Sequence, residues 1–542
     1  MAKTDFVLFS ECVYSGEGDQ PFAGGVAVSG NRIAAVGPRR EIEAWIDSET
    51  IVRDVGKSMI MPGLCDAHGH FAMGALNASR YFLRDIAESS SEEECVEMVR
   101  KFAQAHPELD CIVGQGWFLA NWNNAPLPTK ASLDRVISDR PVYLGAADAH
   151  TGWVNSKALE ELRRDRGFDP NDPVYGTNVV KLENGEPSGI LREEAWFRFG
   201  AEKVFQPGPD IDEEVERELL QGLARRGITT FCDMSGILQG VNYDAMERIE
   251  QSGDLIVRIN LNPALRRDPD QKEFRELRER FHSDKLCVTG VKGVLDGVTS
   301  THTGYTLEPY TDRPDCRGLL TDERAFFMDS IRMANANGIG VRLHCIADGA
   351  VRLALDCFEN SGRHHDLSNL RNTIEHIENI HPDDIPRFRQ LGVVPSMQPR
   401  HLPLEDNEKI VRMGKERCRW EWPFRSLIDA GAIMAFGTDF PVVDYNPFET
   451  IYYAVTRRGY DGKPTGVNPE EAVTLAETLR AYTFGGAYAS HREHELGTLK
   501  EGMLADIVVL DRNLFAVSAE DIPTAQVLMT MMDGKVVYEA LP

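Results

Sequence analysis

The sequence lacks paired cysteines and long apolar runs. Its ten cysteines are scattered and include no CxxC pair. This argues against a disulfide framework or a cysteine-built zinc site and favours a reducing cytoplasm. No uninterrupted apolar stretch approaches the roughly 18 residues of a membrane-spanning helix, and the opening MAKTDFVLFS lacks the basic and apolar segments of a signal peptide. We therefore expect a cytoplasmic protein with no membrane partner.

Positive charge is also scarce. Lys and Arg number 59 against 85 Asp and Glu, which gives a formal net charge of −26. Such a chain repels nucleic acid and anionic lipid, so neither is an expected partner. The acidity itself is typical of a soluble surface. A small-molecule substrate is the expected partner, and a homo-oligomer such as a dimer stays open.

The two ends of the 542-residue chain are rich in short strand patterns. This length exceeds what one hydrophobic core usually serves, so one large domain with one or two smaller ones is expected. Apolar or alternating runs separated by turn residues lie at 6–9, 25–28, 32–36, 505–510, 526–531 and 535–538. We predict one composite β-sandwich domain, built from residues 1–58 and 491–542.

Between these ends, short apolar runs alternate with helical patterns, as in repeated βα units. The candidate strands are 59–65, 227–232, 256–261, 288–295, 338–343, 372–374, 392–396 and 432–436. Eight such units favour a closed (β/α)8 TIM barrel over an open sheet, here across residues 59–490. The fold class is therefore α/β.

The gap between the first two of these strands is too long for one helix. It runs from about residue 71 to 226 and contains strand patterns of its own at 111–114 and 141–146. A structureless loop of that length is not expected inside a compact domain. We predict an inserted α/β subdomain over residues 75–205.

Several histidines, a lysine and an aspartate lie at or just beyond predicted barrel strands. They are His68, His70, Lys292, His344, His376 and Asp439. Barrel enzymes place catalytic groups at the carboxyl ends of strands, and imidazole with carboxylate suits zinc and related divalent metals. In a strand, residues that are two positions apart point to the same side, so His68 and His70 can share one ion.

Each of these features alone has a structural explanation. An HxH pair is often incidental, and a single histidine at a strand end can be a core residue. Asp439 could cap the next helix, and Lys292 could extend from a strand to solvent. The whole ordered set, distributed over the ends of several predicted strands, favours a metal centre.

The chain resembles the amidohydrolase superfamily, and within it the amidohydrolase-3 group that includes N-substituted formamide deformylases. The resemblance covers nearly the whole length. It is carried by MPGLCDAHGHF (61–71), PVYLGAADAHTGWVNSKAL (141–159), VKGVLDGVTSTHTG (291–304), RLHCIADGA (342–350), IEHIE (374–378), FGTDFPVVDYNPF (436–448) and LGTLKEGMLADIVVLD (496–511). The residues after His344 and around Asp439 depart from the more usual wording, which affects pocket shape more than the ligand set.

The resemblance implies a role for each candidate. His68 and His70 match the ligands of a buried metal, and Asp439 matches an aspartate that touches this metal and shuttles protons. His344 and His376 match the ligands of a second, more exposed metal. Lys292 matches a lysine that is carboxylated in many relatives and bridges two metals, and His150 matches a histidine near the substrate.

The expected cofactors are one or two divalent metal ions, with zinc expected first, and carbon dioxide as a carbamate on Lys292. A metal lowers the pKa of water to about 7, and the resulting hydroxide would attack an amide, N-acyl or N-formyl carbonyl. Asp439 would carry the proton to the leaving nitrogen, with His376 or His302 as alternatives. Without a carbamate, Lys292 could pair with Asp296 and leave a single-metal site.

The walls of the site are less defined. His150, Trp117 and Arg400 are the substrate-binding candidates, although an aromatic residue is more often part of a core and Arg400 could face solvent. The leading function is a metal-dependent hydrolase acting on a carbon–nitrogen bond other than a peptide bond. The alternatives are a deaminase, a lactonase or an isomerase on the same metals, and a barrel that binds or regulates without catalysis.

Overall fold

The protein is described here by a computed structural model. The described residues are 4–123, 125–147, 151–205, 211–236, 241, 243–404, 408–459, 462–465 and 468–540. The chain divides into two compact units. Unit 1 comprises Met1–Phe71, Leu220–Val241 and Glu247–Pro542, and unit 2 comprises Ala72–Leu219 and Asn242–Met246.

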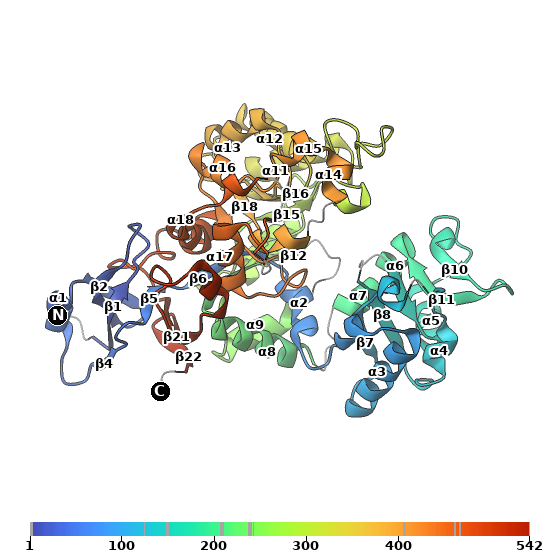
Figure 1. The fold of residues 1–542 in the computed structure, drawn as a ribbon, viewed down its shortest axis with the longest axis horizontal. Helices are drawn as coiled ribbons and strands as arrows, with labels where there is room; N and C mark the ends of the chain where they lie inside the picture. The colour runs from blue at the N-terminus through green and yellow to red at the C-terminus, as the bar shows by residue number, and fades with distance from the viewer. Residues whose placement is uncertain are drawn as a thin grey trace. The chain divides into compact units, whose positions relative to one another are not determined.

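Strands from both ends of the chain form one sheet in unit 1, as the blue and red strands in Figure 1 indicate. Its strands are β1 (Phe6–Val13), β2 (Phe22–Ser29), β3 (Arg32–Gly37), β4 (Ile51–Asp54), β5 (Met59–Pro62), β20 (Ile507–Leu510), β21 (Val527–Met532) and β22 (Lys535–Glu539). They run in the order β22-β21-β20-β5-β1-β2-β3, with β4 also beside β1. Alternate apolar residues of these strands, such as Leu8, Val26 and Val509, share one buried core, as the period of two in a strand requires.

The remaining strands of unit 1 form two parallel sheets. One contains β14 (Leu286–Val288), β13 (Arg258–Pro263), β12 (Ile228–Gly236) and β6 (Leu64–Gly69) in that order. The other runs β15 (Val291–Val294), β16 (Val341–Cys345), β17 (Thr373–His376), β18 (Val394–Met397) and β19 (Ala435–Phe436). Almost every residue of these strands is buried, as expected of parallel strands covered on both faces.

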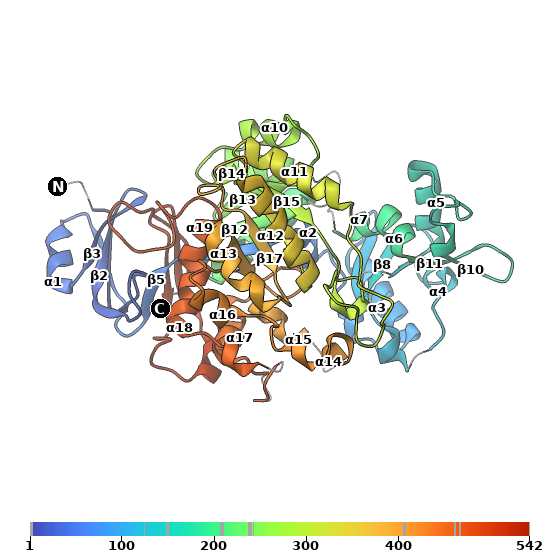
Figure 2. The same ribbon diagram turned by 90° about the horizontal axis from the view of Figure 1, so that it is seen from above.

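Helices precede, connect or follow the parallel strands along the chain. The longer ones are α8 (Asp212–Arg225), α9 (Asp244–Gln251), α10 (Lys272–Arg280), α11 (Arg324–Ala336), α12 (Asp348–Gly362), α13 (Ile385–Leu391), α16 (Phe424–Asp429), α17 (Pro447–Thr456) and α18 (Leu475–Arg480). Helices α11 and α12 pack on each other (Figure 2). Both also contact β16. The fold of this part is therefore α/β, as the alternating pattern predicted.

One predicted strand is divided in the structure. The apolar run 59–65 spans the end of β5, which pairs with β1 and β20, and the start of β6, which pairs with β12. Gly63 separates them, and a Cβ there would lie 2.1 Å from Thr229 Oγ1. The chain therefore leaves the terminal sheet and enters the parallel sheet at a position that only glycine fits.

Unit 2 has a sheet of its own, in the order β10-β11-β9-β8-β7. These strands are β7 (Ile112–Trp117), β8 (Val142–Ala146), β9 (Thr151–Val154), β10 (Val179–Lys181) and β11 (Pro187–Arg192). Helix α3 (Glu92–Ala105) begins at Ser91, whose side chain accepts a hydrogen bond from the Glu94 N–H, a usual N-cap. No helix in the described parts of either unit combines the length and apolarity needed to cross a membrane.

Candidate metal centre

The candidate ligands lie at the carboxyl ends of parallel strands. His68 is the last residue but one of β6, His376 is the last residue of β17, and Asp439 follows β19. His344 lies near the end of β16, opposite Glu375 in the register of β16 with β17. The topology therefore gathers residues from distant parts of the sequence at one edge.

Asp439 is the centre of the cluster. Its Oδ1 lies 2.9 Å from His70 Nε2 and 3.2 Å from His68 Nε2. Its Oδ2 lies 3.7 Å from His401 Nε2. One carboxylate thus faces histidines with both of its oxygens. All four side chains are buried, so these charges interact more strongly than they would in water.

A buried ion pair holds His68 in place. His68 Nδ1 lies 2.7 Å from Glu375 Oε2, and Glu375 Oε1 accepts a hydrogen bond of 2.7 Å from Arg342 Nε. Arg342 also donates to the Ala67 carbonyl oxygen, 2.7 Å away. A carboxylate on one ring nitrogen fixes the orientation and tautomer of a histidine, so His68 Nε2 is left to face Asp439.

Burial and charge set the protonation states in the cluster. Burial alone would raise the pKa of Asp439, but His68 and His70 lower it well below its usual range. Burial lowers the pKa of His344 to about 3 and that of His376 well below its usual value. The carboxylate is therefore ionised and these two imidazoles are neutral at pH 7, which are the forms that bind a metal.

The backbone bends sharply at two of these positions. His376 has φ 74° and Asp439 has φ 62°, values that non-glycine residues seldom adopt. Such conformations cost about 1–3 kcal/mol each and are retained where the surroundings hold them. At Asp439 the N–H donates to the His68 carbonyl oxygen over 2.7 Å, which ties the two ligands together through the main chain.

The donor atoms fit a divalent metal. Among the residues described, the buried atoms His70 Nδ1, Lys292 Nζ, His344 Nε2 and His376 Nδ1 have no hydrogen-bond partner. Buried polar atoms are rarely left in this state. His68, His70 and Asp439 each offer one ligand atom, and these three atoms lie within 4.8 Å of one another. The same holds for one ligand atom from each of His376, His401 and Asp439. Imidazole and carboxylate are ligands that zinc accepts.

Lys292 does not pair with Asp296. Asp296 instead accepts hydrogen bonds from the backbone N–H groups of Tyr305, Ile346 and Ala347, at 2.9–3.1 Å. Lys292 is 2% exposed, and burial lowers its pKa to about 8. The alternative in which this lysine is neutralised by Asp296 is therefore wrong.

Two residues of the site escaped the sequence interpretation. His401 lies in η7 (Pro399–Leu404), directly after β18, so the rule used for the other strand ends applied to it equally. Glu375 lies inside β17 and is fully buried. A carboxylate within an apolar strand signals a buried partner, and that signal was available in the sequence.

The other predicted site residues lie outside the Asp439 cluster or outside the described residues. His302 pairs with Asp312 at 2.8 Å, and Arg400 forms an ion pair with Glu449. Trp117 belongs to the buried core of unit 2, where its Nε1 donates to the Leu144 carbonyl oxygen. His150 is not among the described residues. Their roles in catalysis or substrate binding stay predictions.

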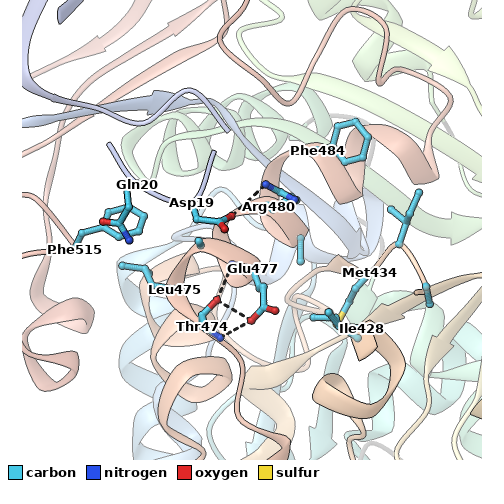
Figure 3. Close-up of a pocket in the computed structure, with 14 residues that line it drawn as sticks. Asp19, Gln20, Ile428, Met434, Thr474, Leu475, Glu477, Arg480, Phe484 and Phe515 are labelled. Carbon is cyan, nitrogen blue, oxygen red and sulfur yellow. Dashed lines mark hydrogen bonds and ion pairs between the residues drawn. The ribbon is translucent and has the colours of Figure 1, made fainter. Parts of the chain in front are cut away.

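A cavity of about 710 Å³ lies elsewhere in unit 1 (Figure 3). Residues 432–434, which precede β19, line it together with Leu475, Arg480 and Phe515. Asp439 lies beyond the opposite end of β19. This cavity is therefore separate from the candidate metal centre.

Comparison with known proteins places the chain in a family. The sequence profile of the amidohydrolase family matches residues 52–538, so the chain belongs to the amidohydrolase family. It is accordingly an enzyme of the hydrolase class that acts on carbon–nitrogen bonds.

Individual relatives cover almost the whole chain. LONG AFTER FAR-RED 3 of Arabidopsis thaliana is 29% identical over 98% of this chain and 91% of its own length. N-substituted formamide deformylase of Arthrobacter pascens is 24% identical over 99% of this chain and 98% of its own. The structure of an uncharacterized metal-dependent hydrolase of Pyrococcus furiosus is similar at a TM-score of 0.75, with 25% identity, over 94% of this chain and 99% of that one.

Proposed function

We propose that the protein is a metal-dependent hydrolase that cleaves an amide, N-acyl or N-formyl carbon–nitrogen bond in a small molecule. The observation that carries the proposal is the buried contact of Asp439 with His68 and His70, at 3.2 and 2.9 Å. The similarity to a formamide deformylase over nearly the whole chain supports the bond type.

The two parallel sheets are proposed to close into one (β/α)8 barrel. Backbone contacts on both sides support closure. Ala264, just after β13, bridges Lys292 of β15 in parallel, and the Leu265 N–H donates to the Lys292 carbonyl oxygen. On the other side, the Asp439 N–H after β19 donates to the His68 carbonyl oxygen of β6. The sheet of the two termini is proposed to be the composite β-sandwich, extended by β5.

The chemistry follows from the charge states of the cluster. A bound divalent metal lowers the pKa of a water molecule to about 7 and polarises a carbonyl oxygen. Asp439, held as an anion, accepts the proton from water and donates it to the leaving nitrogen. Glu375 keeps His68 oriented through this cycle, and the low pKa of His376 keeps that ring neutral.

Lys292 is proposed to carry a carbamate. An ammonium group among ligand atoms would repel a cation, whereas a buried amine without a hydrogen-bond partner among the described residues is a nucleophile. Its nitrogen would form a bond to the carbon of carbon dioxide and release a proton. The product is an anion with two oxygens, which suits a position between two ions.

Metal analysis and a substrate panel test this function together. Protein expressed with added zinc and purified without chelator is expected to hold one to two equivalents of divalent metal per chain. In a panel of N-formyl, N-acyl and cyclic amides, aminopurines and lactones, it should hydrolyse members of the amide group, with the chelated protein as control. Less than about a tenth of an equivalent of any transition metal, or turnover confined to aminopurines, lactones or no compound at all, contradicts the proposal.

A further inference from the structure

We propose that His401 is a ligand of a second divalent cation, which it binds together with His376 and Asp439. The inference rests on the proposed metal-dependent function and adds to it a ligand from η7, the segment that follows β18. It assigns the two oxygens of Asp439 to two different ions.

The two carboxylate oxygens of Asp439 contact different histidines. Its Oδ1 is occupied by His68 and His70, which lie at 3.2 and 2.9 Å. Its Oδ2 points to the other side, where His401 Nε2 lies 3.7 Å away. A carboxylate with different imidazoles at its two oxygens is arranged to bridge two cations.

The spacing of the donor atoms is the second argument. One ligand atom from each of His376, His401 and Asp439 lie within 4.8 Å of the other two, and all three residues are buried. Two nitrogens bound to one tetrahedral zinc at 2.0–2.1 Å are roughly 3.3 Å apart. Small side-chain rotations would bring these atoms to that separation.

The surroundings of His401 hold its ring toward the cluster. The His401 N–H donates to the Gln398 carbonyl oxygen over 2.9 Å, which forms the turn after β18. The ring lies edge-on to buried Trp422, with centroids 6.0 Å apart. It is inclined by 21° to the ring of His376, whose centroid is 6.2 Å away. His401 is therefore fixed by packing on one side and faces the ligands on the other.

This assignment modifies the expected second site. His344 was predicted to share the ion with His376, and the rings of these residues are 4.4 Å apart. His401 approaches the same ring from the neighbouring strand, so the second ion would have protein ligands on both sides. A purely structural histidine packed on Trp422 is the competing explanation, and metal stoichiometry separates the two.

The experiment compares the parent with His401→Ala and with Arg400→Ala. Arg400 is the adjacent residue in η7 and pairs with Glu449, so its variant controls for disturbance of that segment. Each protein is stripped of metal and titrated with Co²⁺, and bound metal is measured by elemental analysis and by visible absorption. The parent and Arg400→Ala are expected to bind two equivalents and His401→Ala one.

The outcomes distinguish this inference from the proposed function. A His401→Ala protein that binds as much Co²⁺ as the parent overturns the inference, as does an Arg400→Ala protein that also loses one equivalent. A parent with one equivalent overturns the second ion but leaves the proposed hydrolase intact, whereas a parent with none overturns both.

A second pair of variants covers the case in which His401→Ala does not fold. Aspartate can ligate a cation and asparagine of the same size does so weakly, so His401→Asp should bind two equivalents and His401→Asn one. Equal binding by these two variants overturns the inference.

Discussion

Asp439 contacts histidines through both carboxylate oxygens while its own backbone N–H is bonded to the His68 carbonyl oxygen. The side chain therefore has little freedom to rotate. Its depressed pKa, maintained by His68 and His70 against the effect of burial, keeps it an anion throughout the neutral range. A group in this state can take a proton only from a donor that is itself made acidic.

The first residue-scale prediction concerns this proton transfer. Asp439→Asn keeps the shape and one ligand oxygen but cannot accept a proton, so turnover should fall by about 10²–10⁴-fold. The first equivalent of metal and the circular dichroism spectrum should stay close to those of the parent. Steady-state kinetics on the best amide of the panel gives the comparison. Activity within tenfold of the parent would assign the proton transfer to another group, such as His376 or His302.

The second residue-scale prediction concerns Lys292. If its carbamate bridges two ions, Lys292→Ala should lose metal and activity, and a small carboxylic acid such as formate should restore part of both. The acid should not restore the turnover of Asp439→Asn, because a carboxylate bound in place of the carbamate does not replace the proton acceptor at position 439. Lys292→Ala protein with full metal content and near-parental turnover excludes the bridging role.

The sequence predicted some residues of the candidate metal centre and missed others. His68, His70, His376 and Asp439 were identified because several polar residues ended predicted strands in order. His401 met the same criterion, but the neighbouring Arg400 was chosen as the candidate from that segment. Which of two adjacent side chains faces the cluster depends on the turn after β18, and a sequence pattern does not specify that turn.

At the scale of elements, the end of β19 must lie very close to β6. A Cβ at Gly437 would lie 2.4 Å from the His68 backbone nitrogen and 2.8 Å from Asp66 Oδ1. Asp66 accepts hydrogen bonds from the Thr438 N–H and hydroxyl, at 3.0 and 2.6 Å. The glycine thus allows the two strand ends to meet, and with them His68 and Asp439.

The element-scale prediction is that Gly437→Ala separates these strand ends. Overpacking of this kind costs about 1–3 kcal/mol, and a misplacement of about 1 Å at a catalytic group lowers turnover by on the order of 10²-fold. We expect weaker metal binding and a lower melting temperature, measured by chelator competition and calorimetry. Gly18→Ala is the control, because a Cβ there meets nothing within 4 Å. Equal metal affinity in both variants contradicts the close-approach argument.

The sequence predicted which segments form strands better than it predicted which strands pair with each other. The runs at 256–261 and 392–396 correspond to β13 and β18 with shifts of about two residues. The run at 59–65 was predicted as one strand because Met59 to Cys65 is apolar throughout. Its division between two sheets depends on β20, which pairs with β5 from the far end of the chain, and no local pattern contains that partner.

At the scale of the whole molecule, the metal centre exists only when distant segments meet. His70 and Asp439 are 369 residues apart in the sequence yet 2.9 Å apart in space. The unfolded chain has no such arrangement, so metal affinity belongs to the folded state and stabilises it. The same coupling applies to protons, because the buried histidines of the cluster titrate differently in the folded and unfolded chains.

The direction in which pH changes the free energy of unfolding follows from the pKa of His344. Its pKa is about 3 in the folded protein, lowered by burial and by Lys292, whereas an exposed histidine has a pKa of about 6.5. Between these values the unfolded chain binds a proton that the folded protein does not. The free energy of unfolding therefore falls as pH decreases from about 6.5 toward about 3. Above about pH 6.5 His344 is neutral in both the folded and the unfolded chain, so it no longer lowers the free energy of unfolding.

Metal-free protein should therefore lose stability in weak acid through the cluster. Parent protein treated with chelator and its His344→Gln variant would be compared by thermal unfolding between pH 7.5 and pH 5. Glutamine does not titrate, so the melting temperature of the variant should fall less steeply with decreasing pH, whatever its value at pH 7.5. Zinc should raise the melting temperature of the parent most at pH 7.5, because protons compete with the metal for the same imidazoles. Parallel pH profiles for the two metal-free proteins would show that His344 remains protonated to the same extent in the folded and unfolded chains, contrary to its buried position.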